Sequence, residues 1–234
     1  MTQSYGSTYD PRPVEALGEN ARAGFVVRTY NHLFAAIVGF VAVEYFFFTT
    51  GLAEVMAQAM LGTSWLLVLG GFILVNWLAT RTAHNAVSLG SQYLALAGFV
   101  VAQAVIFVPM LYIAAYYTQG GVIESAATVT LLGFGGLTAV AFWTRKDFSF
   151  LGAMLRWVGI LALVAIVAAV LFGFELGTWF SIGMIGIAGA AILYDTSNVI
   201  HHYPQDRYVA AALQLFASVA LMFWYVLRLF MSRD

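Results

Sequence analysis

Asp195 is the residue of this sequence with the clearest capacity for chemistry. It follows an apolar stretch, residues 178–194 (TWFSIGMIGIAGAAILY), that is typical of a membrane helix. An ionisable side chain at that depth is costly to place and commonly marks an ion pathway or a switch. We expect the helix to end near residue 200, so that Asp195 lies about 7 to 8 Å inside it at 1.5 Å per residue, within reach of water.

Other polar side chains are also predicted to lie inside apolar stretches: Glu44, Asn76, Gln103, Gln214 and Ser218. Gln214 and Ser218 are four residues apart and therefore share one helix face. Amide side chains in membrane helices commonly form interhelical hydrogen bonds, so the amides are candidates for structural contacts as well as for function. Glu44 is a lone carboxylate, which needs a partner, a cavity or a proton.

Cationic groups near the same end offer partners for Asp195. Arg81 follows the second apolar stretch on the side where Asp195 is expected, so it is either an ion-pair partner for Asp195 or an ordinary flanking cation. His201 and His202 are adjacent and point in different directions on a regular helix. A metal site that combines both with Asp206 competes with the simpler interpretation of two solvated side chains.

Several chemistries are excluded by residues that the sequence lacks. A retinal Schiff base needs a lysine in the last helix, and the only lysine, Lys146, lies between two apolar stretches. An intramembrane aspartyl protease needs a second catalytic aspartate in a GxGD setting, and neither a GxxxxGK[ST] loop nor an HExxH pair is present. The sequence has no cysteine and a net charge of -1, which excludes thiolate chemistry and disfavours nucleic acid as a partner. We therefore expect neither an enzyme nor a bound cofactor.

The composition indicates an integral membrane protein. Hydrophobic residues make up 62% of the chain, charged residues 9%, and the mean hydropathy is +0.87. The apolar stretches are long and lack the alternation of membrane strands, so we predict an all-α fold, a seven-helix transmembrane bundle. The seven stretches are 30–50, 64–79, 89–117, 126–143, 155–174, 178–200 and 208–230. Residues 1–29 are predicted to form a polar, partly disordered N-terminal arm, and residues 30–234 a single transmembrane domain.

The basic residues predict the orientation. If seven helices cross, the N-terminal side holds eight of the ten Lys and Arg residues, and the opposite side holds Arg228 and Arg233. Cytoplasmic loops retain Lys and Arg, so we predict a cytoplasmic N-terminus. If the last stretch does not cross, all ten lie on one side, so this rule does not decide between six and seven spans. The length and apolarity of residues 208–230 favour seven.

Two motifs resemble the Bax inhibitor family, also called transmembrane Bax-inhibitor-motif proteins. The C-terminal signature of that family is similar to residues 192–200 (ILYDTSNVI), followed by Tyr203, 208–213 (YVAAAL) and 227–229 (LRL). Residues 136–142 (GLTAVAF) and 144–152 (TRKDFSFLG) resemble the loop between the family's fourth and fifth helices. The start of the first helix, RTYNHLFAAIVGF, is similar to bacterial members, which implies the cytoplasmic (inner) membrane.

The resemblance implies a compact bundle with a central last helix and a passive calcium leak, gated by protonation of two aspartates. Asp195 matches the first aspartate, whereas Ser218 stands where the family has the second. The loss of one carboxylate removes the charge repulsion that raises a pKa and weakens calcium coordination, which leaves Asp195 as the candidate calcium ligand. Arg81 corresponds to the arginine that latches the first aspartate in this family.

We therefore expect a pH-sensitive calcium or cation leak in which Asp195 is the gate and Ser218 and Arg81 are its partners. Glu44, Gln103 and Gln214 are further candidates within the membrane. The resemblance also implies an alternative, a non-conducting regulator that binds a membrane protease or another membrane protein. A small-solute transporter is a third hypothesis. Ion flux in liposomes distinguishes conduction from regulation.

Overall fold

The computed structural model describes residues 12–63, 65–85 and 88–232, without the side chains of residues 65, 66, 68, 69, 72, 76 and 83–85. The described residues form helices and no strand. A short 3-10 helix, η1 (Val14–Ala16), precedes the α-helices, which are α1 (Glu19–Thr49), α2 (Leu52–Leu61), α3 (Trp65–Asn85), α4 (Leu89–Tyr116), α5 (Val122–Thr144), α6 (Leu151–Phe172), α7 (Gly177–His201) and α8 (Tyr208–Met231).

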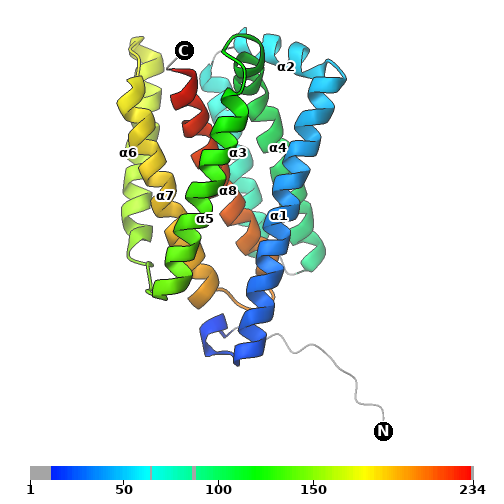
Figure 1. Cartoon of the computed structure of the whole chain (residues 1–234), viewed down its shortest axis with the longest axis vertical. Helices are drawn as coiled ribbons and strands as arrows, with labels where there is room; N and C mark the ends of the chain where they lie inside the picture. The colour runs from blue at the N-terminus through cyan, green and yellow to red at the C-terminus, as the bar shows by residue number, and fades with distance from the viewer. Residues whose placement is uncertain (1–11, 64, 86–87, 233–234) are drawn as a thin grey trace.

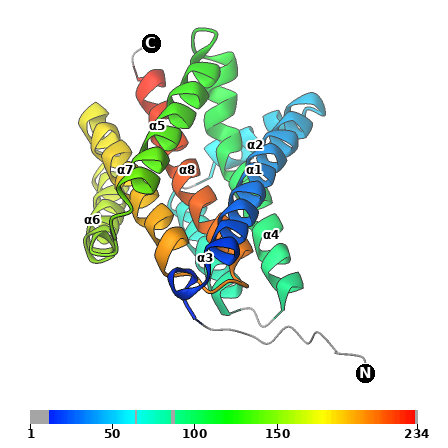
Figure 2. The same ribbon diagram turned by 60° about the horizontal axis from the view of Figure 1, so that its bottom comes forward.

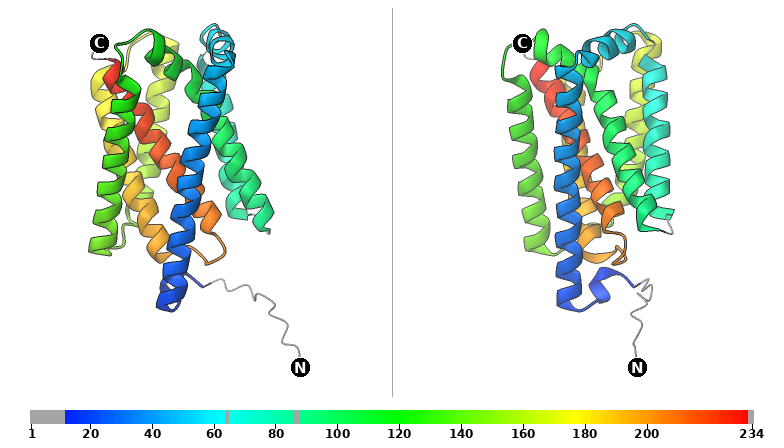
Figure 3. Two further views of the ribbon diagram at one scale, coloured as in Figure 1. Left: turned by 45° about the vertical axis from the view of Figure 1, so that its right-hand side comes forward. Right: turned by 90° about the vertical axis from the view of Figure 1, so that its right-hand side faces the viewer.

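The long helices run side by side between two ends of a bundle (Figure 1). We call the lower end the one where α1 begins and α7 meets α8, and the upper end the one where α2 lies and α8 finishes. The two side views in Figure 3 show the same arrangement, with α1 rising and α2 lying across the upper end. The first residues of α1 and the last of α8 therefore lie at opposite ends of the bundle.

Six of these helices are long and apolar enough to cross a membrane: α1, α4, α5, α6, α7 and α8. The protein is thus an all-helical integral membrane protein, as predicted. The fold also contains α3, which has 21 residues and extends for about 32 Å at 1.5 Å per residue. The seven predicted stretches coincide with α1 and α3 to α8, so the positions of the long helices are confirmed.

Two predictions about the N-terminal third need correction. The first helix begins at Glu19 rather than Tyr30, so residues 19–29 are helical rather than part of an irregular arm. The hydropathy window detects the apolar part of a helix, whereas residues 19–29 contain three charged residues and are still helical. Partial disorder was predicted for the arm as a whole, and residues 1–11 of that arm lie outside the described residues. The ten-residue helix α2 was not predicted, and it follows a tight turn at Gly51, whose φ is 78°.

Helix α8 is central in the bundle. It packs against α1, α3, α4, α5 and α7, and Figure 2 shows it enclosed by them. In its most apolar part 72% of the residues are buried, against 6% for α6, so α8 is an interior helix and α6 a peripheral one. The predicted central position of the last helix is therefore confirmed.

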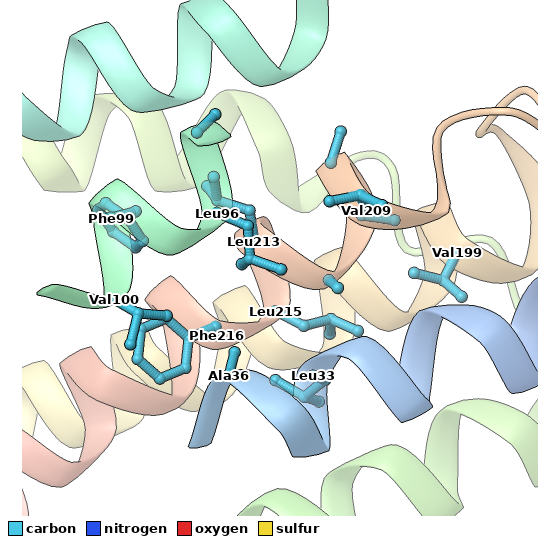
Figure 4. Packing of buried hydrophobic residues seen from close by; sticks show 14 of the residues in the cluster. Leu33, Ala36, Leu96, Phe99, Val100, Val199, Val209, Leu213, Leu215 and Phe216 are labelled. Atoms are coloured by element: carbon cyan, nitrogen blue, oxygen red, sulfur yellow. The ribbon is translucent and has the colours of Figure 1, made fainter. Parts of the chain in front are cut away.

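The core at the lower half is built from α1, α4, α7 and α8, as the close view in Figure 4 shows. Three consecutive alanines of α8, Ala210 to Ala212, are completely buried there. Lipid chains are as apolar as these side chains, so membrane helices associate through close packing rather than through escape from water. Small residues on α8 let the neighbouring backbones approach and fix the position of its polar groups.

Candidate functional site

The site is a hydrogen bond between Asp195 of α7 and Ser218 of α8. The Ser218 hydroxyl donates to Oδ2 of Asp195 at 2.5 Å. Both side chains are buried, with exposed fractions of 2% for Asp195 and 5% for Ser218. The two residues are 23 positions apart, and the antiparallel packing of α7 on α8 brings them together. The structure thus brings these two candidate residues into contact.

A glycine of α6 lies close to α7 beside this contact. A Cβ atom at Gly152, near the start of α6, would lie only 2.7 Å from Cε2 of Tyr194, the residue that precedes Asp195. Any other residue at position 152 would displace the tyrosine ring. The Tyr194 ring therefore packs closely against α6 next to the position of Asp195.

Three further hydroxyl groups lie around the site, on Tyr30 of α1, Thr138 of α5 and Thr196 of α7. The oxygen atoms of all three hydroxyl groups are buried. The Tyr30 side chain lies next to both threonines and close enough to Asp195 to interact with it electrostatically. Sequence reasoning missed these residues, because single hydroxyl groups in apolar stretches carry no pattern of their own. The immediate neighbourhood of Asp195 is thus rich in hydroxyls.

Arg81 does not pair with Asp195 in this structure. Its side chain is exposed, and its guanidinium carbon lies 5.0 Å from the centroid of the Trp77 ring. Residues four apart share a helix face, and Trp77 is itself exposed, so Arg81 stays on the outer surface of α3 in a cation–π contact. No ion pair to Asp195 is formed by the described residues. The ion pair expected from the sequence is therefore absent among the described residues, and Asp195 accepts its hydrogen bond from Ser218.

The other predicted polar residues are not part of this contact. Gln103 is buried on α4, with 4% of its surface exposed, and Gln214 is half-buried on α8. Glu44 is buried on α1, and neither of its carboxylate oxygens has a hydrogen-bond partner among the described residues. The side chain of Asn76 lies outside the described part of the chain. Among the site residues predicted from the sequence, Asp195 and Ser218 are the pair for which the structure shows a hydrogen bond.

The connection between α7 and α8 closes the lower end beneath Asp195, and the N-terminal segment holds it. The backbone N–H of Val14 donates to the carbonyl of Tyr203 at 2.9 Å, and Val14 is completely buried. Nδ1 of His201 lies 3.4 Å from Oε2 of Glu15. The Tyr203 ring stacks on Phe25 with centroids 6.3 Å apart. Residues 14–25 therefore cover this connection from below.

The loop between α5 and α6 holds the same connection from the other side. Nε2 of His202 lies 3.5 Å from Oδ2 of Asp147, and the N–H of Phe148 donates to Ser197 at 2.9 Å. The N–H of Ser149 donates to Asp147, and this bond, with the nearby histidines, lowers the pKa of the Asp147 carboxyl. The two histidines thus pair with different segments. The described residues contain no group of three His, Asp or Glu side chains placed to hold a metal, so the hypothesis of a histidine metal site is wrong.

The geometry of the Asp195 contact suits a switch rather than a catalyst. An ionised carboxylate can accept a strong hydrogen bond from Ser218, and a protonated one forms a weaker, neutral bond. The charge state of Asp195 therefore changes the strength of the bond between α7 and α8. No catalytic arrangement is evident among the described residues.

Comparison with known proteins identifies the family. The family model described as "Inhibitor of apoptosis-promoting Bax1" matches residues 22–234. The chain belongs to the Bax inhibitor-1 family. The resemblance inferred from the two sequence motifs is therefore confirmed, and both motifs lie within the matched residues.

Relatives in this family come from bacteria and plants. The "Modulator of FtsH protease YccA" of Escherichia coli is 33% identical over 172 residues, which is 72% of this chain and 76% of the relative. The uncharacterized protein Cj0236c of Campylobacter jejuni is 30% identical and covers 92% of this chain and 94% of its own length. "Protein LIFEGUARD 4" of Arabidopsis thaliana is 33% identical over 126 residues, and this chain spans about half of its length (50%). No solved structure matches the chain.

Proposed function

We propose that this protein is a passive, pH-sensitive leak for calcium or related cations in the cytoplasmic membrane, and that Asp195 is its gate. The observation that carries this proposal is the buried hydrogen bond from Ser218 to Asp195. An ionisable group inside the membrane commonly marks an ion pathway. Here that group joins α7 to the central helix α8, so a change in its charge acts on the core of the bundle.

The switch has a defined direction. When Asp195 is ionised, it accepts a charge-assisted hydrogen bond, which is about twice as strong as a neutral one. This bond holds α7 against α8 and closes the pathway. Protonation removes the charge and weakens the bond, so opening is favoured at low pH. In the closed state Ser218 is thus the partner of Asp195, the role that the sequence suggested for Arg81.

The lower end of the bundle fits a cytoplasmic gate. Most basic residues in the described part of the chain lie there, at the ends of helices or in the connections: Arg12, Arg22, Arg28, Arg81, Arg145, Lys146, Arg156 and Arg207. The positive-inside rule supports a cytoplasmic position for this end, and we propose seven crossings with a cytoplasmic N-terminus. The cover formed by residues 14–25 and the Asp147 loop then lies between Asp195 and the cytoplasm.

Ser218 sets this chain apart from the two-aspartate arrangement that the family resemblance implies. One carboxylate and one hydroxyl offer calcium less charge than two carboxylates. We therefore propose that calcium interacts weakly at Asp195 and passes rather than being retained. Conduction requires this balance, in which an ion binds well enough to enter and weakly enough to leave.

Flux from liposomes tests the proposal. Purified protein is reconstituted with a calcium indicator inside the vesicles, and calcium entry is compared with that in protein-free vesicles of the same lipid at about pH 5 and pH 8. The expected result is protein-dependent entry that is faster at the lower pH. Calcium entry equal to that of protein-free vesicles at both pH values would contradict the proposal that the protein conducts calcium.

A second candidate function is regulation of a membrane protease. The relative YccA is named a modulator of the FtsH protease, and it covers 72% of this chain. A chain that conducts nothing but copurifies with a membrane-bound protease of its own cell, and alters cleavage of that protease's substrates, would favour this function. Liposome flux separates the two functions, because a regulator alone conducts no ions.

A further inference from the structure

Four polar side chains from three helices meet near the lower end of the bundle: Arg28 and His32 of α1, Tyr93 of α4 and Tyr208 of α8. We call them the Arg28 cluster. Nδ1 of His32 lies 2.7 Å from the carbonyl oxygen of Arg28, and Nε2 lies 2.8 Å from the Tyr93 hydroxyl. The His32 ring also lies against the Tyr208 ring, with centroids 5.1 Å apart. These contacts join α1, α4 and α8 at one point.

The guanidinium group of Arg28 is held at this point without an acidic partner. Its central carbon lies 5.7 Å from the centroid of the Tyr208 ring, and the side chain is exposed. Within the described part of the chain Arg28 forms no ion pair. Asp206, two residues before Tyr208, pairs instead with Arg207 at 3.7 Å. The N–H donors of Arg28 are therefore available to an anion from outside the protein.

The directions of the hydrogen bonds leave the Tyr208 hydroxyl as a further donor. The carbonyl of Arg28 can only accept, so a neutral His32 ring carries its proton on Nδ1. Nε2 then accepts from the Tyr93 hydroxyl. The Tyr208 hydroxyl lies next to that of Tyr93 and can donate either to the Tyr93 oxygen or to an anion. A guanidinium group and a phenol hydroxyl are thus donors at one place.

The Arg28 cluster lies where the helices enter the apolar layer. Tyr208 is the first residue of α8, and Tyr93 lies in the second turn of α4. Further into the bundle the same faces carry exposed apolar residues, Ala35 on α1 and Ala97 and Val101 on α4. Tyrosine is typical of the boundary between lipid chains and headgroups. The abundant anions at that boundary are the phosphate groups of phospholipids.

We propose that the Arg28 cluster binds the phosphate group of an anionic phospholipid. The guanidinium group of Arg28 offers parallel N–H donors that match two phosphate oxygens. The Tyr208 hydroxyl donates to the same phosphate, and the acyl chains lie along the apolar faces of α1 and α4. An anionic lipid is preferred to a zwitterionic one, because its headgroup has no amine that competes with Arg28 for the phosphate.

His32 and Tyr93 are positioning residues in this site. The bond from His32 to the Arg28 carbonyl fixes the ring on α1, and its bond with Tyr93 fixes α4 beside it. A lipid bound here contacts α1 and α8 together, beside the connection between α7 and α8. The inference goes beyond the proposed leak and does not depend on it, because lipid binding is measured without ion flux.

Binding of radiolabelled phosphatidylglycerol to the purified full-length protein in detergent tests the site. Arg28→Gln removes the charge and should weaken this binding about fivefold, the effect of one basic side chain at a lipid surface. Tyr208→Phe keeps the ring beside Arg28 but removes the hydroxyl, so it should weaken binding by a smaller factor. Arg81→Gln is the matched control and should change nothing. Arg81 is also an exposed arginine beside an aromatic ring, Trp77, but no other helix adds a polar contact to it in the described part of the chain.

Competition identifies the ligand. Excess unlabelled phosphatidylglycerol should displace the labelled lipid from the wild-type protein, whereas phosphatidylcholine and inorganic phosphate at the same concentration should not. Displacement by inorganic phosphate would overturn the assignment to a lipid, because the site would then bind free phosphate. Displacement by phosphatidylcholine as efficient as that by phosphatidylglycerol would overturn the preference for an anionic headgroup.

Equal phosphatidylglycerol binding in the folded Arg28→Gln and Arg81→Gln proteins would overturn the proposal, because a general attraction to basic residues would then account for it. Gel-filtration elution identical to that of the wild type establishes that each variant is folded. If Arg28→Gln does not fold, Arg28→Lys replaces it. Lysine keeps the charge but lacks the planar fork, so weaker binding than in the wild type is expected, and unchanged binding would overturn the two-oxygen contact.

Discussion

Replacing Ser218 by alanine removes the hydrogen bond that we assign to the closed state. A hydrogen bond to a charged group contributes about 1.5 to 3 kcal/mol. Since 1.4 kcal/mol corresponds to a factor of ten, Ser218→Ala should raise the open fraction about 10- to 100-fold at neutral pH. At low pH the bond is neutral and contributes about 0.5 to 1.5 kcal/mol, so the increase there should be about two- to tenfold. The mutation should therefore flatten the pH dependence of the leak.

The assay is calcium flux into liposomes between about pH 5 and pH 8, at equal protein-to-lipid ratio. Ser181→Ala is the matched control, because Ser181, like Ser218, is a buried serine. It belongs to α7 and lies near the other end of that helix from Asp195. This variant should leave the pH profile as it is in the wild type. If the folded Ser218→Ala protein keeps the wild-type ratio of calcium flux between the two pH limits, the hydrogen bond to Asp195 does not control the pH dependence of opening.

Three further results are expected. Ser218→Asp places a second carboxylate beside the first, because the present Ser218 hydroxyl lies 2.5 Å from Oδ2 of Asp195. Charge repulsion should then make flux more responsive to pH near neutrality, and an unchanged profile would refute this. Arg81→Ala should leave basal flux unchanged because Arg81 is exposed. A higher basal flux in this variant would instead support the ion pair between Arg81 and Asp195 that the sequence suggested. Because the pKa of Asp147 is lowered by its hydrogen bond to a backbone N–H, its contribution to stability is complete well above about pH 4 and lost as the pH falls through the lowered value. The Tm difference between wild type and Asp147→Asn should therefore shrink below that pH, and a constant difference would contradict it.

The long helices were predictable because their signal is local and strong. Stretches of about twenty apolar residues have few alternatives to spanning a bilayer. The start of α1 at Glu19 was not predictable in this way, because residues outside the lipid do not contribute to the hydropathy signal. Helix α2 escaped detection because ten residues are too short for the window that finds spanning segments. Gly51, in the turn before it, was the available signal.

The site was predictable only where a sequence motif carried it. The proximity of Asp195 and Ser218 followed from the family resemblance and is present in the structure. The position of Arg81 depends on the rotation of α3 about its axis, which spacing along the chain does not determine. Tyr30 reaches the site from another helix, and no short-range pattern links it to Asp195. Contacts between helices distant in sequence are set by packing, which a single sequence does not display.

Calcium flux through Asp195→Asn tests the central claim most directly. Asparagine has the shape of the protonated acid but cannot ionise, so the variant should conduct at a rate that no longer varies between about pH 5 and pH 8. That rate should be close to the wild-type rate at the acidic limit, with the variant folded as judged by gel filtration. A variant that retains the wild-type dependence of flux on pH would contradict the account, because the sensor would then be a group other than Asp195.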